Sequence, residues 1–466
     1  MNIIFITVVS SLLGVVFGFS LQGGGVILLS IFSISSLFFI IKVTSRKINL
    51  ILPTIIFYLS YYLVTSYWVL SYFNMYIDMN YLKILLFISI AFLHAIYSSV
   101  PILLAKYLNN FTSALPIFIV TFELLKEFIP FIYPWLRPSV ILISANTSWL
   151  FRTIGSYGVD FLFYFFCVFV LNVIEERKVS KNDIKIIFSI LSLFILDKVN
   201  LSDNNKEETI TVSVLHENTP SRRLSNLEAI NDYLLSSINI NSDMYVWPEG
   251  IYHINKEELN YFSDKYEGTL SKTIFGMEGY LYDYKFNYLT SGKYAYPLYV
   301  KENLVPFSEY TPSWIRYIYS GGGNLNEFSS YDKFIGEYIP FNDKLNIVYM
   351  ICYDTIFTKF EQGDIIVVSS SLLWAKDNWL KVTLLNFTRI RAAETNMPVF
   401  YSTNGGISAI IEGDSSLLSY SDTEKQEFIT STVIYSSNNR TLYVLSGGIS
   451  LVLFFSFYLF IFFRIK

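Results

Sequence analysis

The stretch Val348–Asp354 reads Val-Tyr-Met-Ile-Cys-Tyr-Asp, four apolar or aromatic residues followed by a cysteine, a tyrosine and an acid. The first part favours a buried strand at Asn346–Ile351, and a short helical stretch is expected at Thr355–Phe360. A thiol between a strand end and a helix N-terminus is placed to ionise and to meet a substrate. Cys352 is therefore a candidate nucleophile, although a buried cysteine taken alone is more often structural.

Strand and helix patterns alternate on both sides of this stretch. We expect a hairpin around Thr273–Thr290 and a long amphipathic helix at Asn378–Thr395. This alternation predicts an α/β domain arranged as an α+β sandwich with more than one sheet edge. The other predicted strands are Ile210–Leu215, Met244–Trp247, Ile365–Val368, Val399–Ser402 and Ser408–Ile411, and the other predicted helices are Ser225–Ser237 and Lys256–Lys265.

Two charged side chains of this domain are further candidates. Trp247–Glu249 reads Trp-Pro-Glu, and because proline cannot continue a ladder, the carboxylate of Glu249 is expected at the rim of the sheet. Apolar neighbours would raise its pKa, which suits a general base. Lys301 lies in an apolar segment, where it either reaches water or is held by Glu249 or Glu309. Its charge near a thiol would stabilise an oxyanion. An exposed turn glutamate and a solvated lysine are the ordinary alternatives for each residue alone.

The composition indicates a membrane protein. Of 466 residues, 53% are hydrophobic and only 15% are charged, which is too apolar for an ordinary soluble enzyme. Two cysteines exclude a disulfide framework. The formal net charge of −4 lacks the basic excess of a nucleic-acid-binding protein. The long apolar runs lie in residues 1–200 and 441–463, on either side of the soluble pattern.

We divide the chain into three parts. Residues 1–204 are predicted to form a membrane domain with seven transmembrane helices, residues 205–438 a soluble catalytic domain, and residues 439–466 a C-terminal transmembrane helix. We allow about 20 apolar residues for each span. The eight predicted spans are 3–20, 24–43, 50–73, 83–107, 112–133, 158–175, 184–198 and 442–463, of which 184–198 is the shortest.

Lysine and arginine in the short connections predict the orientation. With eight spans, the basic residues after the second, fourth, sixth and eighth spans lie on one side, and cytoplasmic loops carry such an excess. Both termini are then cytoplasmic and the soluble domain is extracytoplasmic. The cytoplasmic set is Lys42, Arg46, Lys47, Lys106, Arg177, Lys178, Lys181, Lys185, Arg464 and Lys466, against Lys83, Arg137 and Arg152 in short loops on the other side.

Glu249, Lys301 and Cys352, in this order and each beside a strand, resemble the Glu-Lys-Cys triad of the nitrilase superfamily. The flanking residues resemble one family within it, apolipoprotein N-acyltransferase, which has a nitrilase-like domain between transmembrane helices. The matching motifs are Trp-Pro-Glu at Trp247–Glu249, Lys-x-x-Leu-Val-Pro-Phe-x-Glu at Lys301–Glu309, Ile-Cys-Tyr-acid at Ile351–Asp354, and Arg389–Glu394 with Ser402–Gly406. The membrane part is similar more loosely, at Trp68–Val69, Glu123, Pro134–Trp135, Gly155 and Gly158.

The resemblance implies a two-step acyl transfer. Cys352 would take an acyl chain from a membrane phospholipid as a thioester, and the α-amine of a diacylglyceryl-modified cysteine on a lipoprotein would then accept it. Glu249 would be the general base, Lys301 with a backbone N–H would stabilise the oxyanion, and Glu309 would orient Lys301 or help with proton transfer. The implied location is the bacterial inner (cytoplasmic) membrane, with the catalytic domain on the periplasmic side. We expect no cofactor, no metal and no nucleic-acid partner.

The chain departs from the family pattern near the nucleophile. Ser369–Ser371 stands where the family usually has Asn-Asp, which puts the support of the nucleophile loop in question. Asp354 is one methylene shorter than the usual Glu, and Ser308 replaces a customary Gly. Glu123, within a predicted span, contacts substrate, pairs with Lys126 or caps a cavity. The supporting or substrate-binding candidates are Glu309, Trp247, Tyr353, Asp354, Trp374 and Glu123.

Two other functions fit the same residues. A membrane-tethered nitrilase-type amidase would turn over without a phospholipid donor. A non-catalytic binding module would not need the triad, yet all three residues are present. The aromatic stretches Tyr310–Tyr319 and Leu372–Trp379 are either lids near the bilayer surface or simple packing under loops.

Overall fold

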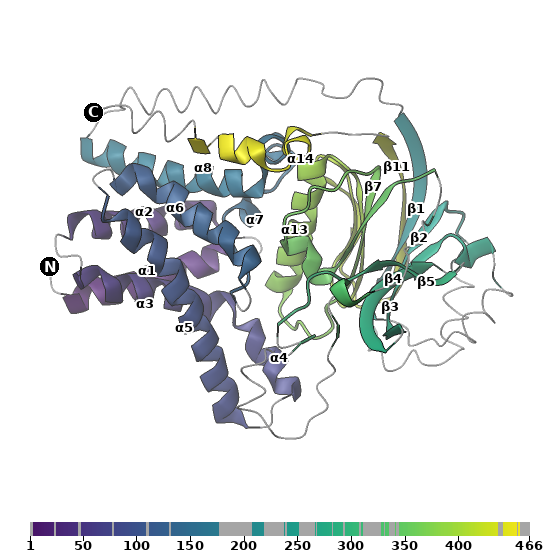
Figure 1. Ribbon diagram of the computed structural model, residues 1–466, viewed down its shortest axis with the longest axis horizontal. Coiled ribbons are helices and arrows are strands. Elements are labelled where there is room, and N and C mark those ends of the chain that lie inside the picture. The colour runs from purple at the N-terminus through teal and green to yellow at the C-terminus, as the bar shows by residue number, and fades with distance from the viewer. Residues whose placement is uncertain are drawn as a thin grey trace. The chain divides into compact units, whose positions relative to one another are not determined.

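The computed structural model (Figure 1) divides into two compact units, described one at a time. The helical unit comprises Met1–Leu201, Lys376–Asn386 and Thr441–Lys466, and the sheet unit comprises Ser202–Ala375 and Phe387–Arg440. The three-part domain division stays a prediction. The residues that the structure describes are 3–22, 25–44, 48–76, 79–108, 111–129, 132–176, 207–218, 237, 240–250, 266, 268–281, 283–291, 294–306, 309–310, 328–329, 331–334, 341, 344–436, 441–453 and 455–456.

The sheet unit is built on one mixed sheet, which has eleven strands within the described residues (Figure 1). Its main path is β10-β9-β8-β1-β2-β3-β4-β5, while β7 pairs with β8, β6 with β7, and β11 with β1. The strands are β1 Glu207–Glu217, β2 Met244–Val246, β3 Thr273–Leu281, β4 Tyr284–Ser291, β5 Tyr294–Val300, β6 Ile347–Ile351, β7 Ile365–Ser371, β8 Val399–Asn404, β9 Ser408–Ile411, β10 Leu417–Ser421 and β11 Glu427–Ser436.

Six strands, in the order β6-β7-β8-β1-β2-β3, run parallel. The residues of β7 from Ile365 to Ser370 are all buried, as expected for a central parallel strand. Strand β5 points the same way as these six, because it is antiparallel to β4 and β4 is antiparallel to β3. The carboxyl ends of β2, β5, β6 and β7 therefore meet at one edge, where open α/β sheets place their sites.

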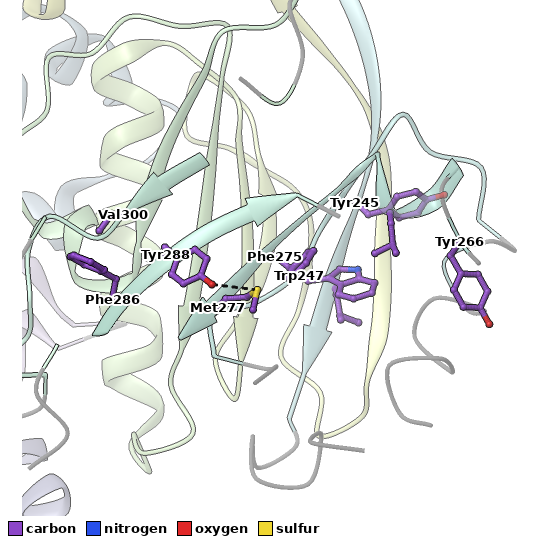
Figure 2. Close-up of a cluster of buried hydrophobic side chains, with 10 residues drawn as sticks. Tyr245, Trp247, Tyr266, Phe275, Met277, Phe286, Tyr288 and Val300 are labelled. Carbon is purple, nitrogen blue, oxygen red and sulfur yellow. Dashed lines mark hydrogen bonds between the residues drawn. The ribbon is translucent and has the colours of Figure 1, made fainter. Parts of the chain in front are cut away.

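A cluster of buried apolar side chains covers one face of β2, β3, β4 and β5 (Figure 2). Phe275 and Met277 on β3 and Phe286 and Tyr288 on β4 belong to it, and the indole ring of Trp247 lies 6.1 Å from the ring of Phe275. Side chains alternate between the faces of a strand. The residues between these core positions, among them Gly276 and Asn287, therefore face the opposite side of the sheet.

The structure confirms the strands and the hairpin predicted in the sheet unit. It also confirms the long helix, α13, which spans Asn378–Thr395. The helical stretch expected after Cys352 is a 3₁₀ turn, Cys352–Ile356, and begins earlier than predicted. Strands β5, β10 and β11 were not predicted. The predicted helix Lys256–Lys265 and residues 225–236 of the other lie outside the described residues.

The helical unit contains, within its described residues, three helices long and apolar enough to cross a membrane. They are α1 Ile3–Leu21, α5 Asn80–Ala105 and α8 Ser148–Glu176. Because the span 184–198 lies outside the described residues, the count of eight spans stays a prediction. The remaining helices here are α2 Ile27–Val43, α3 Ile48–Thr65, α4 Trp68–Tyr76, α6 Phe111–Leu125, α7 Ser139–Leu142 and α14 Leu442–Leu445.

Two predicted spans of the helical unit are broken. The span 50–73 divides at Ser66–Tyr67, where the indole Nε1 of Trp135 donates to the freed carbonyl of Thr65 at 2.9 Å. The span 112–133 ends as an α-helix at Leu125, followed by a 3₁₀ turn, since prolines 130, 134 and 138 lack the N–H that a helix needs.

Glycines alter two more predicted spans. Helix α8 begins ten residues before the predicted 158–175 and contains a non-helical Gly155 (φ 69°), against which the ring of Tyr443 packs so closely that a Cβ would lie 2.2 Å from it. The run 442–463 is interrupted after α14, where Gly447 and Gly448 adopt positive φ. Left-handed backbone is readily adopted by glycine and ends the helix there.

Candidate active site

Cys352 stands at the end of β6 in a strained turn. Its φ is 48°, a left-handed value that non-glycine residues seldom adopt, and its side chain is buried. The carboxylate of Asp354 holds the turn, because its Oδ2 accepts from the backbone N of Ile351 and from the hydroxyl of Tyr299, both at 3.0 Å. The hydroxyl of Thr355 donates to the carbonyl of Cys352 at 2.9 Å.

The other oxygen of Asp354 reaches the segment that follows Lys301. Oδ1 accepts from the backbone N of Asn303 at 2.8 Å and from its side-chain amide at 3.0 Å. One buried carboxylate thus ties the cysteine turn to the lysine segment. The shorter acid is long enough for all four hydrogen bonds.

Lys301 lies between two carboxylates. Its Nζ is 2.6 Å from Oε1 of Glu309 and 3.3 Å from Oε1 of Glu249. Lys301 is 1% exposed and Glu249 is 5% exposed, so the three charges are paired away from water. The sequence placed Glu249 at a rim, but the structure buries it, because β3 passes directly beneath. A Cβ on Gly276 of β3 would lie 2.5 Å from Cα of Glu249.

Each carboxylate also accepts backbone N–H groups. Oε2 of Glu249 accepts from the N of Ser371 at 2.9 Å, and Oε2 of Glu309 accepts from the N of Val305 at 2.8 Å. The side-chain amide of Asn287 on β4 donates to Oε1 of both glutamates. Asn287 was not predicted as a site residue, because no motif or spacing distinguishes it within an apolar strand.

Burial controls the ionisation of this cluster. Burial raises the pKa of Glu249 to about 7, although Lys301 opposes the shift. Burial raises the pKa of the Cys352 thiol to about 12, with Glu249 adding to the rise and Lys301 opposing it. For Lys301, burial acts to lower the pKa, but the neighbouring carboxylates outweigh it and raise the pKa well above its usual value. At neutral pH the thiol is therefore protonated, contrary to the ready thiolate expected from the sequence.

The three serines that depart from the family pattern form the end of β7 and contact the site. The hydroxyl of Ser369 donates to the carbonyl of Trp247 at 3.0 Å. Ser370 forms a hydrogen bond with the thiol of Cys352, which acts to lower the thiol pKa. The backbone N of Ser371 donates to Glu249, as described above. The three serines therefore contact the backbone before Glu249, the thiol of Cys352 and the carboxylate of Glu249.

The other predicted supporting residues lie in three different surroundings. Trp247 is buried in the core cluster (Figure 2). Its backbone N donates to the carbonyl of Ile274 at 2.8 Å. Tyr353 is buried, with its ring 5.1 Å from the ring of Phe357. The indole Nε1 of Trp374 donates to the carbonyl of Ser371 at 3.0 Å, next to the N–H bound by Glu249. Of the aromatic stretch Tyr310–Tyr319, residues 311–319 lie outside the described residues.

Glu123 belongs to the helical unit. The Nζ of Lys126 donates to both of its carboxylate oxygens, at 2.7 and 2.8 Å, and to the hydroxyl of Tyr62 at 2.8 Å. The structure thus shows the ion pair with Lys126, and a direct role of Glu123 toward substrate stays a prediction. Such a pair limits the cost of placing a charge in an apolar surrounding.

Comparison with known proteins finds sequence similarity in the helical unit and along most of the chain. Residues 13–169 match the family model for the apolipoprotein N-acyltransferase N-terminal domain. A protein named apolipoprotein N-acyltransferase from Wigglesworthia glossinidia brevipalpis is 25% identical over 430 residues, which cover 85% of each chain. One of the same name from Coxiella burnetii is 24% identical over 348 residues, 69% of this chain and 70% of that protein.

A solved structure of a CN-hydrolase superfamily protein from Xanthomonas campestris is also similar. It is 17% identical, covers 48% of this chain and 91% of its own, and gives a TM-score of 0.34, too low to add to the sheet topology described above. The sequence relatives carry the assignment instead. Through the match of residues 13–169 and the alignment over 85% of its length, the chain is similar to the apolipoprotein N-acyltransferases.

Proposed function

We propose that this protein moves an acyl chain from a membrane phospholipid to the N-terminal amine of the diacylglyceryl cysteine of an apolipoprotein, the last step of lipoprotein maturation. The observation that carries the proposal is the buried cluster at the carboxyl ends of β2, β5 and β6, where Lys301 pairs with Glu249 and Glu309 and couples electrostatically to Cys352. The names of the relatives support the choice of acceptor.

In the first half-reaction, the sulfur of Cys352 attacks the ester carbonyl of the phospholipid. Because the pKa of the thiol is raised to about 12 and that of Glu249 to about 7, the thiol proton passes to ionised Glu249 as the S–C bond forms. The charge that develops on the carbonyl oxygen is stabilised by Lys301 and a backbone N–H near Cys352. The C–O bond then breaks, and the lysophospholipid leaves with the proton held by Glu249.

In the second half-reaction, the α-amine of the acceptor attacks the thioester. Glu249 accepts a proton from the amine, the C–S bond breaks, and the sulfur regains a proton, which restores the starting state. Glu309 serves throughout as the near partner of Lys301, at 2.6 Å, and fixes the ammonium group. No step uses histidine, a metal or a cofactor.

The proposed location follows from the substrates. Both are lipids held in a membrane, and the helical unit contains helices long and apolar enough to cross one. We assign the protein to the bacterial inner membrane as a multi-pass protein, with the sheet unit on the periplasmic side, in accord with the Lys and Arg asymmetry of the short connections.

The acyl-enzyme can be tested directly. The purified full chain in detergent is incubated with phospholipid alone, and intact mass is compared for wild type, Cys352→Ala and Glu249→Gln. We expect an adduct on the wild type that hydroxylamine removes, none on Cys352→Ala, and much slower formation on Glu249→Gln. A diacylated lipopeptide with a free N-terminal amine should then discharge the adduct.

Two results would decide against the proposal. An adduct that persists in Cys352→Ala would exclude the thioester. A folded wild type that forms no adduct but hydrolyses soluble amides without phospholipid would indicate the amidase alternative.

A further inference from the structure

The side-chain amide of Asn287 lies between the two carboxylates of the site. Its Nδ2 donates to Oε1 of Glu249 and, at 3.2 Å, to Oε1 of Glu309. Asn287 is 1% exposed, and its Oδ1 has no hydrogen-bond partner among the residues that the structure describes. A buried polar atom left unpaired costs free energy. The two bonds made by the nitrogen therefore determine the orientation of the amide.

The opposite orientation is unfavourable. A half-turn of the amide would place Oδ1, which only accepts, against carboxylate oxygens that also only accept when ionised. The NH₂ group has two hydrogens, one for each carboxylate. The backbone holds this group in place as well, because the N of Lys301 donates to the carbonyl of Asn287 at 2.9 Å.

We propose that Asn287 is a positioning residue of this site, which holds Glu249 and Glu309 on its two N–H bonds so that Glu249 stays available to the thiol while Glu309 stays with Lys301. The inference rests on the proposed function only in giving Glu249 the role of general base. It adds a residue that neither the triad nor its flanking motifs contain.

The proposal has a consequence for pH dependence. The charged or titratable groups that act on Glu249 are Lys301 after β5, Glu309, and Glu278 on β3, while Cys352 after β6 and Tyr401 on β8 respond to its charge. The hydrogen bond from Asn287 acts to lower the pKa of Glu249. Removing it raises that pKa, so at a given pH less of the base is ionised. The acid limb of a rate profile that depends on ionised Glu249 must then move to higher pH.

The test measures the rate at which iodoacetamide alkylates Cys352 between about pH 5 and pH 10, by mass of the Cys352 peptide from the full chain in detergent. Because the pKa of the thiol is raised to about 12, alkylation in this range requires the thiol proton to pass to ionised Glu249 as the S–C bond forms, so the wild-type limb is expected near pH 7. For Asn287→Leu, which keeps the volume but removes the donor, we expect the limb about one pH unit higher. The rate would be about fivefold lower at pH 7 and would approach the wild-type rate at about pH 9.

Tyr288→Phe is the matched control. It removes a buried polar atom from the next position of the same strand, on the core side, where the hydroxyl donates to the sulfur of Met277 at 3.9 Å and contacts neither carboxylate of the site through a hydrogen bond among the described residues. Its limb should stay near pH 7. If Asn287→Leu does not fold, the same pH profile is measured for Asn287→Asp, whose side chain has nearly the same shape. A third carboxyl group beside the other two should move the limb further up.

The inference is wrong if the limb stays near pH 7 in the Asn287 variants while only the amplitude falls, because that is the result of a purely structural role. Alkylation does not involve a phospholipid, so it tests the role of Asn287 independently of the proposed acyl transfer. A shifted limb without any acyl adduct would reject the proposed acyl transfer and leave the role of Asn287 intact, whereas an adduct with an unshifted limb would reject only the role of Asn287.

Discussion

Asp354 joins three segments of the site through one side chain. It accepts from Ile351 at the end of β6, from Tyr299 on β5 and from Asn303 in the segment after Lys301. The hydroxyl of Tyr299 in turn accepts from Nζ of Lys359 at 3.0 Å. Four donors on one buried carboxylate explain how Cys352 is kept in its left-handed conformation, whose strain must be balanced by surrounding bonds.

We predict that Asp354→Asn destabilises the protein by about 1–3 kcal/mol and slows thioester formation. An amide has one acceptor oxygen, so its NH₂ group must face the N–H groups either of Asn303 or of Ile351. Thermal unfolding in detergent, followed by circular dichroism, measures the first effect, and the acyl-adduct rate measures the second. Asp332→Asn, on an exposed 3₁₀ turn, is the control. Identical unfolding of both variants would contradict the role given to Asp354.

The residues that can be found from the sequence are those with chemistry of their own. Cys352 and Glu249 follow predicted strands and Lys301 lies in an apolar segment, and the structure brings the two charges within 3.3 Å. Asn287 carries no such signal, because a single amide in a strand is compatible with many environments. The rise in the thiol pKa was also not predictable, since it depends on burial, which only tertiary packing sets.

At the scale of elements, β3 determines how deep Glu249 lies. Its alternating side chains put Phe275 and Met277 into the core, and on the other face Gly276 lets the backbone of Glu249 come close. Close approach of another backbone is one reason for glycine inside a strand. The loop after β2 can thus hold the carboxylate of Glu249 next to Lys301.

We predict that Gly276→Ala destabilises the protein by about 1–3 kcal/mol and lowers the rate of thioester formation, because the new Cβ would lie 2.5 Å from Cα of Glu249 and backbone cannot move aside cheaply. Gly279→Ala on the same strand is the control, since its Cβ would make only an ordinary contact, 3.5 Å from the hydroxyl of Tyr288. Unfolding midpoints and adduct rates of the two variants test the difference. Equal midpoints and equal rates for the two variants would show that the close approach of β3 does not control how far Glu249 is buried.

The elements with long, regular patterns were predictable. Helix α13 has the predicted bounds, Asn378–Thr395, because its periodic pattern is uninterrupted. Strand β11 was not found, since its Thr and Ser residues, such as Thr430 and Thr432, pair with Ser213 and Thr211 of β1 through hydroxyls rather than through an apolar face. The break between α3 and α4 was also not predictable from the local sequence, because the hydrogen bond that stabilises it comes from Trp135, about 70 residues away in sequence.

For the whole molecule, the proposed acyl transfer requires the lipid substrates and the sheet unit to be on the same side of the membrane. On the eight predicted spans, the connections after the second, fourth, sixth and eighth spans carry ten Lys and Arg residues. The other side has Lys83, Arg137 and Arg152, of which the structure places Lys83 in α5 and Arg152 in α8. Positive residues in short loops are retained in the cytoplasm. Long domains cross regardless of their charge, so residues 205–438 do not count in this comparison.

We predict that alkaline phosphatase fused after Asn204 is active and that green fluorescent protein fused there is dark, because the first needs the periplasm and the second the cytoplasm. The control fusion, after Lys178, should give the reverse pattern. Together the two positions bracket residues 184–198. Opposite patterns at the two positions mean that this span crosses the membrane, whereas the same cytoplasmic pattern at both would mean that it does not, and would place the catalytic residues on the side away from the proposed lipoprotein acceptor.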